Sequence, residues 1–170
     1  TGAIHIIHCD ALQCIDGLSI VPTNAKIVSW GFIETIVLDS NSDSGIHINP
    51  AAGGVVKGLT FVDCWAATNT QQGIKTGTTG TIDGLRFIGA KVYNNTSHGI
   101  IHQGGINVNF DDCDVGGNEN GIVITQDVTA WAIRNCRIGQ QAGFGNTQSY
   151  NILLNVSGWD NYLIENNDVR

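Results

Sequence analysis

The sequence predicts an all-β chain that folds as a right-handed, single-stranded parallel β-helix, a solenoid of about seven coils. Two repeats point to this fold: an eight-residue segment recurs along the chain, and a shorter segment alternates with it at the same period. Composition agrees, because 22 glycines and only 2 prolines in 170 residues favour short strands and turns over long helices.

The eight-residue segment has apolar or small residues at its first, third, sixth and eighth positions. Its clearest copies begin at Leu59, Leu85, Val108, Trp131 and Tyr162, and two earlier copies fit if they begin at Ile4 and Trp30. Alternation that is broken once in the middle is typical of two short strands joined by a tight bend. The predicted core column at the third position is Ile6, Phe32, Phe61, Phe87, Phe110, Ile133 and Ile164.

The shorter segment is a turn residue, then Gly, then an aliphatic residue. Its glycines are Gly17, Gly45, Gly73, Gly99 and Gly121, and Asn151 replaces Gly in the last copy. The spacings run from 22 to 30 residues, which suits coils whose loops differ in length. Leucine-rich repeats need a fixed frame that is absent, and helical repeats need a 3.6-residue periodicity that is also absent.

Three further columns follow from the same alignment. The sixth position collects Cys9, Thr35, Cys64, Ala90, Cys113, Cys136 and Asn167, which we interpret as a buried small-residue column of reduced thiols rather than a disulfide, metal or nucleophile site. Cys14 lies outside this column and has no assigned role. The bend column is Glu34, Asp63, Gly89, Asp112, Asn135 and Asn166, so Asp111 and Asp112 are not read as a catalytic pair. Trp30 and Trp131 fall at inward positions and are expected in the core.

Two outward columns alternate in charge from coil to coil. They are Lys91, Asp114, Arg137 and Asp168, and Asp111, Arg134 and Glu165. Opposite charges on neighbouring strands form ion pairs, so these acids are expected to be structural.

Composition also limits the possible partners. With 8 Lys and Arg against 15 Asp and Glu, the formal net charge is −7, which argues against nucleic acid and anionic membranes. No apolar run approaches the ~18 residues of a membrane span, and no signal peptide, metal-ligand spacing or cofactor motif is visible. Because the chain begins with Thr1 and contains no Met, we expect residues 1–170 to be a single domain from a longer protein.

The coil spacing and column chemistry resemble the pectate-lyase-like β-helix superfamily, and within it the shafts of bacteriophage tailspikes and tail fibres. The resemblance implies a bacterial surface polysaccharide as partner and a homotrimer as assembly. It also implies a place in the virion tail, with assembly in the host cytoplasm and action at the host cell surface. The polygalacturonase motifs of the superfamily are not reproduced, since His98-Gly99 precedes Asp111-Asp112 and the remaining motifs are missing.

Glycans pack on aromatic faces and bond to polar side chains, which singles out a few residues. The candidate carbohydrate-binding residues are Trp65, Tyr93, Trp159 and Asp160, each of which could instead serve local packing. Glu119 and Asp127 flank the strand at 121–125 and are the candidate carboxylates if the chain is a glycoside hydrolase or polysaccharide lyase. The sequence supports no metal and no cofactor.

Three functions remain open at this point. The first is the tailspike or tail-fibre domain, which recognises and could depolymerise the glycan. The second is a free, secreted polysaccharide lyase or glycoside hydrolase of the β-helix class. The third is a non-catalytic spacer in a fibre or adhesin.

One outward column bears on assembly. It runs through His47, Lys75, Ile101, Val123 and Leu153, and its last three members predict an exposed apolar stripe. Such a stripe is typical of an interface, here between the three chains of a trimer. The alternative is that the loop at 139–149 covers it within one chain.

Overall fold

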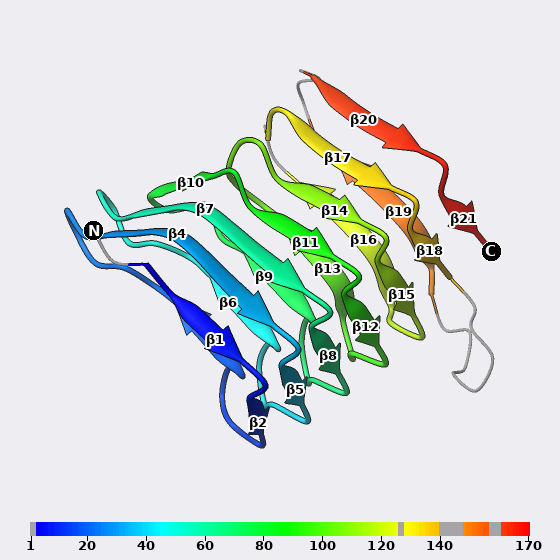
Figure 1. Ribbon diagram of the computed structural model, residues 1–170. Coiled ribbons are helices and arrows are strands. Elements are labelled where there is room, and N and C mark those ends of the chain that lie inside the picture. Colours follow the sequence, from blue (N-terminus) through cyan, green and yellow to red (C-terminus); the bar gives the residue numbers. More distant parts are fainter. Residues whose placement is uncertain (1–2, 126–127, 140–147, 157–160) are drawn as a thin grey trace.

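The computed structural model describes residues 3–125, 128–139, 148–156 and 161–170. Its strands stack into a parallel β-solenoid with three sheets, and every strand pair in the three sheets is parallel (Figure 1). Six turns each contribute one strand to every sheet, and two further strands form a partial seventh turn. The all-β solenoid of about seven coils is therefore confirmed.

The first sheet, sheet A, carries the candidate site described below. Its strands in spatial order are β1 (His5–Ile7), β4 (Ile27–Glu34), β7 (Val55–Val62), β11 (Arg86–Ile88), β14 (Asn109–Asp111), β17 (Trp131–Arg134) and β20 (Tyr162–Glu165), with β10 (Thr81–Asp83) also paired to β7.

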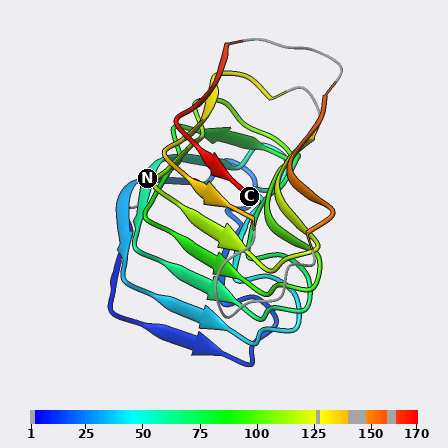
Figure 2. The same cartoon turned by 90° about the vertical axis from the view of Figure 1, so that its right-hand side faces the viewer.

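The other two sheets complete each turn. Sheet B contains β2 (Asp10–Leu12), β5 (Val37–Asp39), β8 (Trp65–Ala67), β12 (Lys91–Tyr93), β15 (Asp114–Gly116), β18 (Arg137–Ile138) and β21 (Asp168–Val169). Sheet C contains β3 (Leu18–Ile20), β6 (Ile46–Ile48), β9 (Ile74–Thr76), β13 (His98–His102), β16 (Asn120–Thr125) and β19 (Tyr150–Asn155). Figure 2 shows the coils following one another from the blue N-terminal end to the red C-terminal end. In the described part of the chain, no helix is long and apolar enough to cross a membrane.

Stacked columns of like residues fill the interior. Phe61, Phe87 and Phe110 are fully buried and lie ring on ring, with centroids 4.6 and 5.3 Å apart and planes within 14° of parallel. Trp131 is also buried, as predicted. The aliphatic residues that follow the repeated glycines pair from Leu18 through to Ile152 in the predicted register.

The second copy of the eight-residue segment starts one residue later than predicted. Ile33, not Phe32, pairs with Phe61, and the exposed fraction is 50% for Phe32 and 71% for Trp30. The predicted core positions of Trp30 and Phe32 are therefore wrong. A one-residue slip moves every side chain of a strand to the opposite face, and both frames of this segment offer apolar residues.

The bend column is confirmed apart from that copy. Left-handed φ angles of 49–65° occur at His8, Thr35, Asp63, Gly89, Asp112, Asn135 and Asn166. Thr35 thus makes the bend that was assigned to Glu34, and Ile36 fills the inward position that was assigned to Thr35.

The cysteines are unbridged, but not all are buried. Cys64, Cys113 and Cys136 are buried, whereas Cys9 and Cys14 are exposed. The predicted burial of Cys9 is wrong, because this residue lies in the first coil and only one neighbouring coil packs against it. Burial raises the pKa of the Cys64 thiol to about 12, so this group is inert at neutral pH.

The charged columns have the predicted register. Arg134 Nε lies 2.7 Å from Asp111 Oδ1, and Arg137 Nε lies 2.6 Å from Asp114 Oδ1. These contacts account for Asp111 and Asp114 as structural acids.

A ladder of buried asparagines runs beside the Gly column and was not predicted. Asn41 Nδ2 donates to Asn69 Oδ1 at 2.9 Å, Asn69 Nδ2 to Asn95 Oδ1 at 2.8 Å, and Asn95 Nδ2 to Asn118 Oδ1 at 2.9 Å. The ladder explains why Gly recurs beside it: a Cβ on Gly45 would lie 3.0 Å from Asn69 Nδ2 and 2.7 Å from the carbonyl oxygen of Gly73.

Two of the three members of the predicted exposed stripe on sheet C are buried in the single chain, while Leu153 is half-buried. The register of the stripe is as expected, but the exposed fraction is only 8% for Ile101 and 2% for Val123. The loop at 139–149, the predicted alternative cover, lies largely outside the described residues. The expectation that Ile101 and Val123 are exposed is therefore wrong, and the trimer stays a prediction.

Candidate functional site

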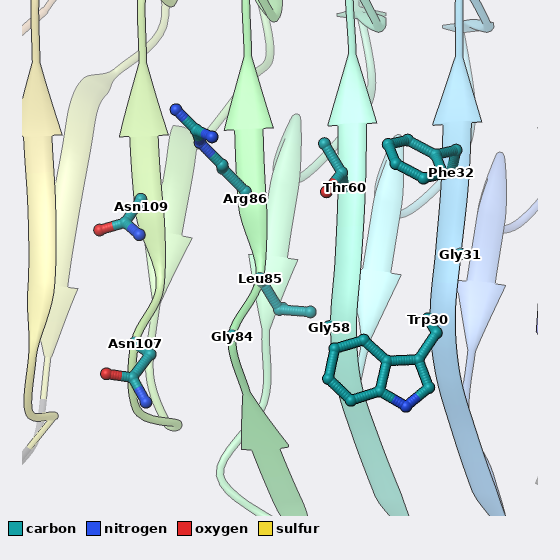
Figure 3. A pocket seen from close by; sticks show the side chains of 10 residues that line it. All are labelled: Trp30, Gly31, Phe32, Gly58, Thr60, Gly84, Leu85, Arg86, Asn107 and Asn109. Carbon is teal, nitrogen blue, oxygen red and sulfur yellow. The ribbon is translucent and has the colours of Figure 1, made fainter.

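A hollow of about 420 Å³ lies on the outer face of sheet A, and its lining residues come from four successive coils (Figure 3). One row of lining residues is Trp30, Gly58, Gly84 and Asn107, and the other is Phe32, Thr60, Arg86 and Asn109, with Gly31 and Leu85 between them. We call this hollow the Trp30 groove. It crosses three strand spacings, roughly 14 Å, at right angles to the strands.

The first row follows a kink that recurs in the coils of sheet A from β4 to β20. The φ angles are 58° at Trp30, 61° at Gly58, 69° at Gly84 and 55° at Asn107. The left-handed conformation costs little for Gly and Asn but is unusual for a bulky residue. The kinks bend the strands locally and leave the two glycine positions as the low floor of the groove.

Trp30 lies flat on this floor. The residue is 71% exposed, and a Cβ on Gly58 would lie 2.7 Å from Cε3 and 2.8 Å from Cζ3 of the indole. Figure 3 shows the indole reaching from β4 over Gly58 of β7. One face of the ring is thus supported by backbone while the side chain as a whole stays largely in solvent, which is the arrangement a stacking platform needs.

Phe32 and Leu85 add apolar surface to the groove, and its polar side chains are Thr60, Arg86, Asn107 and Asn109. Arg86 Nε donates to Asp111 Oδ2 at 3.0 Å, and Asn107 Nδ2 donates to Asp83 Oδ1 at 2.8 Å. Burial works to raise the pKa of Asp111, but hydrogen bonds from Arg134 and Arg86 outweigh it and hold this pKa below its ordinary value. Asp111 therefore remains an anion that fixes the direction of both guanidinium groups.

Two of the predicted carbohydrate-binding residues lie together on another face. Trp65 of β8 and Tyr93 of β12 meet edge to face on sheet B, with ring centroids 5.3 Å apart. Tyr93 is buried, and its hydroxyl donates to Asp114 Oδ2 at 2.8 Å. Burial, followed by that hydrogen bond, raises the pKa of Tyr93 to about 12. Glycan binding by this pair stays a prediction.

The structure does not test the other predicted site residues. Glu119 is exposed in the turn before β16, and Asp127, Trp159 and Asp160 lie outside the described residues. Whether Glu119 and Asp127 converge is thus still a prediction. In the part of the chain that the structure describes, no group of three or more His, Cys, Asp or Glu residues could hold a metal ion.

The Trp30 groove was missed because the second copy was read in the wrong frame. In the correct frame Trp30 aligns with Gly58, Gly84 and Asn107, which are turn residues. An aromatic residue in a column of turn residues is the signal that could have identified it.

The sequence was compared with known protein families and with curated proteins, and neither comparison gives a match. What the structure shows is the fold, a parallel β-solenoid.

Proposed function

We propose that this β-solenoid binds a linear polysaccharide in the Trp30 groove. The observation that carries the proposal is Trp30 itself, an exposed aromatic residue at a left-handed position that the later coils fill with small or turn residues, namely Gly58, Gly84, Asn107, Ala130 and Asn161. A bulky residue at such a position stores strain, and strained residues that burial does not explain are often functional. Sugar rings stack on exposed indoles, and Thr60, Asn109 and Asn107 offer hydrogen bonds further along the groove.

Binding without cleavage is the activity that this groove supports. None of its lining residues is Asp or Glu, so the groove itself contains no carboxylate pair for glycoside hydrolysis. The setting that we propose is a tailspike or tail-fibre shaft in a bacteriophage tail, which meets a bacterial surface polysaccharide as a homotrimer. Unbridged cysteines are compatible with assembly in a reducing cytoplasm.

A structural spacer is the second candidate. The buried asparagine ladder favours it, because polar groups satisfied from coil to coil hold successive coils in one register. The two functions differ in one respect that can be measured, since a spacer needs no glycan and a binder does.

The test is a glycan array probed with the wild-type chain, with Trp30→Asn and with Trp65→Asn. We expect wild type to bind at least one linear glycan, and Trp30→Asn to weaken that binding roughly tenfold or more. Asn suits the left-handed conformation, so the melting temperature of Trp30→Asn should be equal to or above that of wild type.

Trp65→Asn is the matched control on sheet B and should keep the binding. Loss of binding in Trp65→Asn with retention in Trp30→Asn would move the site to the Trp65–Tyr93 face. Absence of any glycan ligand would favour the spacer.

A further inference from the structure

Arg86 is the one charged residue among the lining residues of the Trp30 groove. Its side chain is 53% exposed and projects from β11, the strand next to the one over which the Trp30 indole lies. Among the described residues it is hydrogen-bonded through Nε alone, to Asp111 Oδ2 at 3.0 Å. Its two terminal nitrogens are therefore available to a ligand.

Asp111 does not depend on Arg86 for its charge balance. Arg134 binds the same carboxylate twice, with Nε 2.7 Å from Oδ1 and Nη2 3.1 Å from Oδ2. Arg134 is in turn balanced by Glu165 and Asp112 as well as by Asp111, whereas Asp111 is the one acid that the described contacts give Arg86. A half-exposed guanidinium that is oriented through Nε alone is suited to a carboxylate of the ligand.

Negative charge on the protein around Arg86 limits how many carboxylates the ligand can carry. Asp83 holds Asn107 in the row opposite Arg86, one coil further along, so a second ligand carboxylate there would face a carboxylate of the protein. The chain as a whole carries −7, which disfavours a densely charged polyanion. The charged groups next to the ligand affect binding more than the net charge does, because interactions between charges more than about 8 Å apart are largely screened at physiological salt.

We infer that the Trp30 groove selects a linear glycan in which isolated acidic sugars are separated by neutral ones, an inference that rests on the proposed function. The neutral sugar stacks on Trp30 and the neighbouring acidic sugar places its carboxylate on Arg86. The chain of the glycan runs across the strands, along the stack of coils, because the two lining rows run in that direction (Figure 3).

The test uses the full chain and an array of linear oligosaccharides of three kinds: neutral, acidic on every ring, and acidic on alternate or fewer rings. Each acidic oligosaccharide is also presented after reduction of its carboxylates to alcohols. We expect the strongest ligands to be the sparsely acidic ones, and carboxyl reduction to weaken them roughly tenfold. Arg86→Gln should remove the difference between each acid and its reduced form.

Arg137→Gln is the matched control, because it removes the same charge from sheet B, outside the groove. Arg86→Gln should fold normally, since Arg134 continues to hold Asp111; its melting temperature checks this. Ligands that are strongest when neutral or uniformly acidic, or that are insensitive to Arg86→Gln, would overturn the inference. If such ligands still need Trp30, the proposed function survives; if no glycan binds, both fail.

Discussion

Gly58 and Gly84 occupy equivalent left-handed positions in successive coils, but they differ in what a side chain would meet. Their φ angles are 61° and 69°, so alanine strains the backbone at both, by roughly 1–2 kcal/mol. At Gly58 a Cβ would also strike the Trp30 ring at 2.7 Å, whereas at Gly84 the nearest atom is 3.6 Å away. We expect Gly58→Ala to destabilise the chain by about 1 kcal/mol more than Gly84→Ala in urea unfolding. Equal losses would mean that the indole does not rest on Gly58.

His102 makes stability depend on pH through its burial inside the solenoid. Its Nδ1 lies 2.8 Å from Thr76 Oγ1, while its Nε2 is buried with no partner among the described residues. Burial lowers its pKa to about 4, against about 6.5 in an unfolded chain. The unfolded state therefore binds the proton first as the pH falls. The stabilisation from this group is complete above about pH 6.5 and is lost towards pH 4, by roughly 3 kcal/mol in total.

Urea unfolding at several pH values between 7 and 4.5 measures this loss. His102→Gln keeps a polar side chain beside Thr76 but cannot titrate, so its stability should fall much less over the same range. A wild-type stability that stays flat between pH 6.5 and 4.5 would contradict a neutral, buried His102.

At the scale of the strand, the sequence predicted most of the core but not its frame everywhere. The phenylalanines at 61, 87 and 110 identify their column without ambiguity, because no other frame makes all three inward. The segment around Trp30 has apolar residues in both frames, and only the pairing of Ile33 with Phe61 decides between them. The wrong frame also prevented prediction of the Trp30 groove, since a surface made by four coils needs the right register in each.

The asparagine ladder could not be predicted from the sequence, for a different reason. Asn is common in turns, and its side chain alone does not tell a solvated turn from a buried ladder. What distinguishes Asn41, Asn69, Asn95 and Asn118 is that each amide bonds to its counterpart in the adjacent coil, which depends on long-range stacking. Asp112 was easier to place, because a bend is a local property and does not depend on stacking between coils.

Replacement of Asn69 tests the ladder. Its Oδ1 accepts from the backbone nitrogen and from Nδ2 of Asn41, and its Nδ2 donates to Asn95 Oδ1. Asn69→Ala would leave these buried groups unpaired, so we expect a loss of about 3 kcal/mol in the free energy of unfolding. Asn69→Asp keeps the size and the acceptor but removes the donor, and it should be at least as harmful. A loss under about 1 kcal/mol for both variants would show that the ladder does not stabilise the stack.

At the scale of the whole molecule, the sequence predicted the parallel solenoid and its coil number because these depend on many repeats at once. One misaligned copy out of seven changes a surface but not the architecture. The assembly prediction depended on less, namely the exposure of three side chains on sheet C. Ile101 and Val123 are buried in the single chain, so a trimer, if it forms, needs another argument for its interface.

Val123→Lys tests whether the outward column of sheet C is buried within one chain or lies between separate chains. Val123 is 2% exposed on β16, so a lysine there would bring a charge into an apolar site, and we expect the single chain to lose about 3 kcal/mol. Ser19→Lys is the matched control, because Ser19 is exposed in the same outward column on β3 and should tolerate the charge. Thermal unfolding measures the stability of both variants, and sedimentation velocity measures their mass. A Val123→Lys variant that melts with wild type but sediments as a smaller species would show instead that this column joins separate chains.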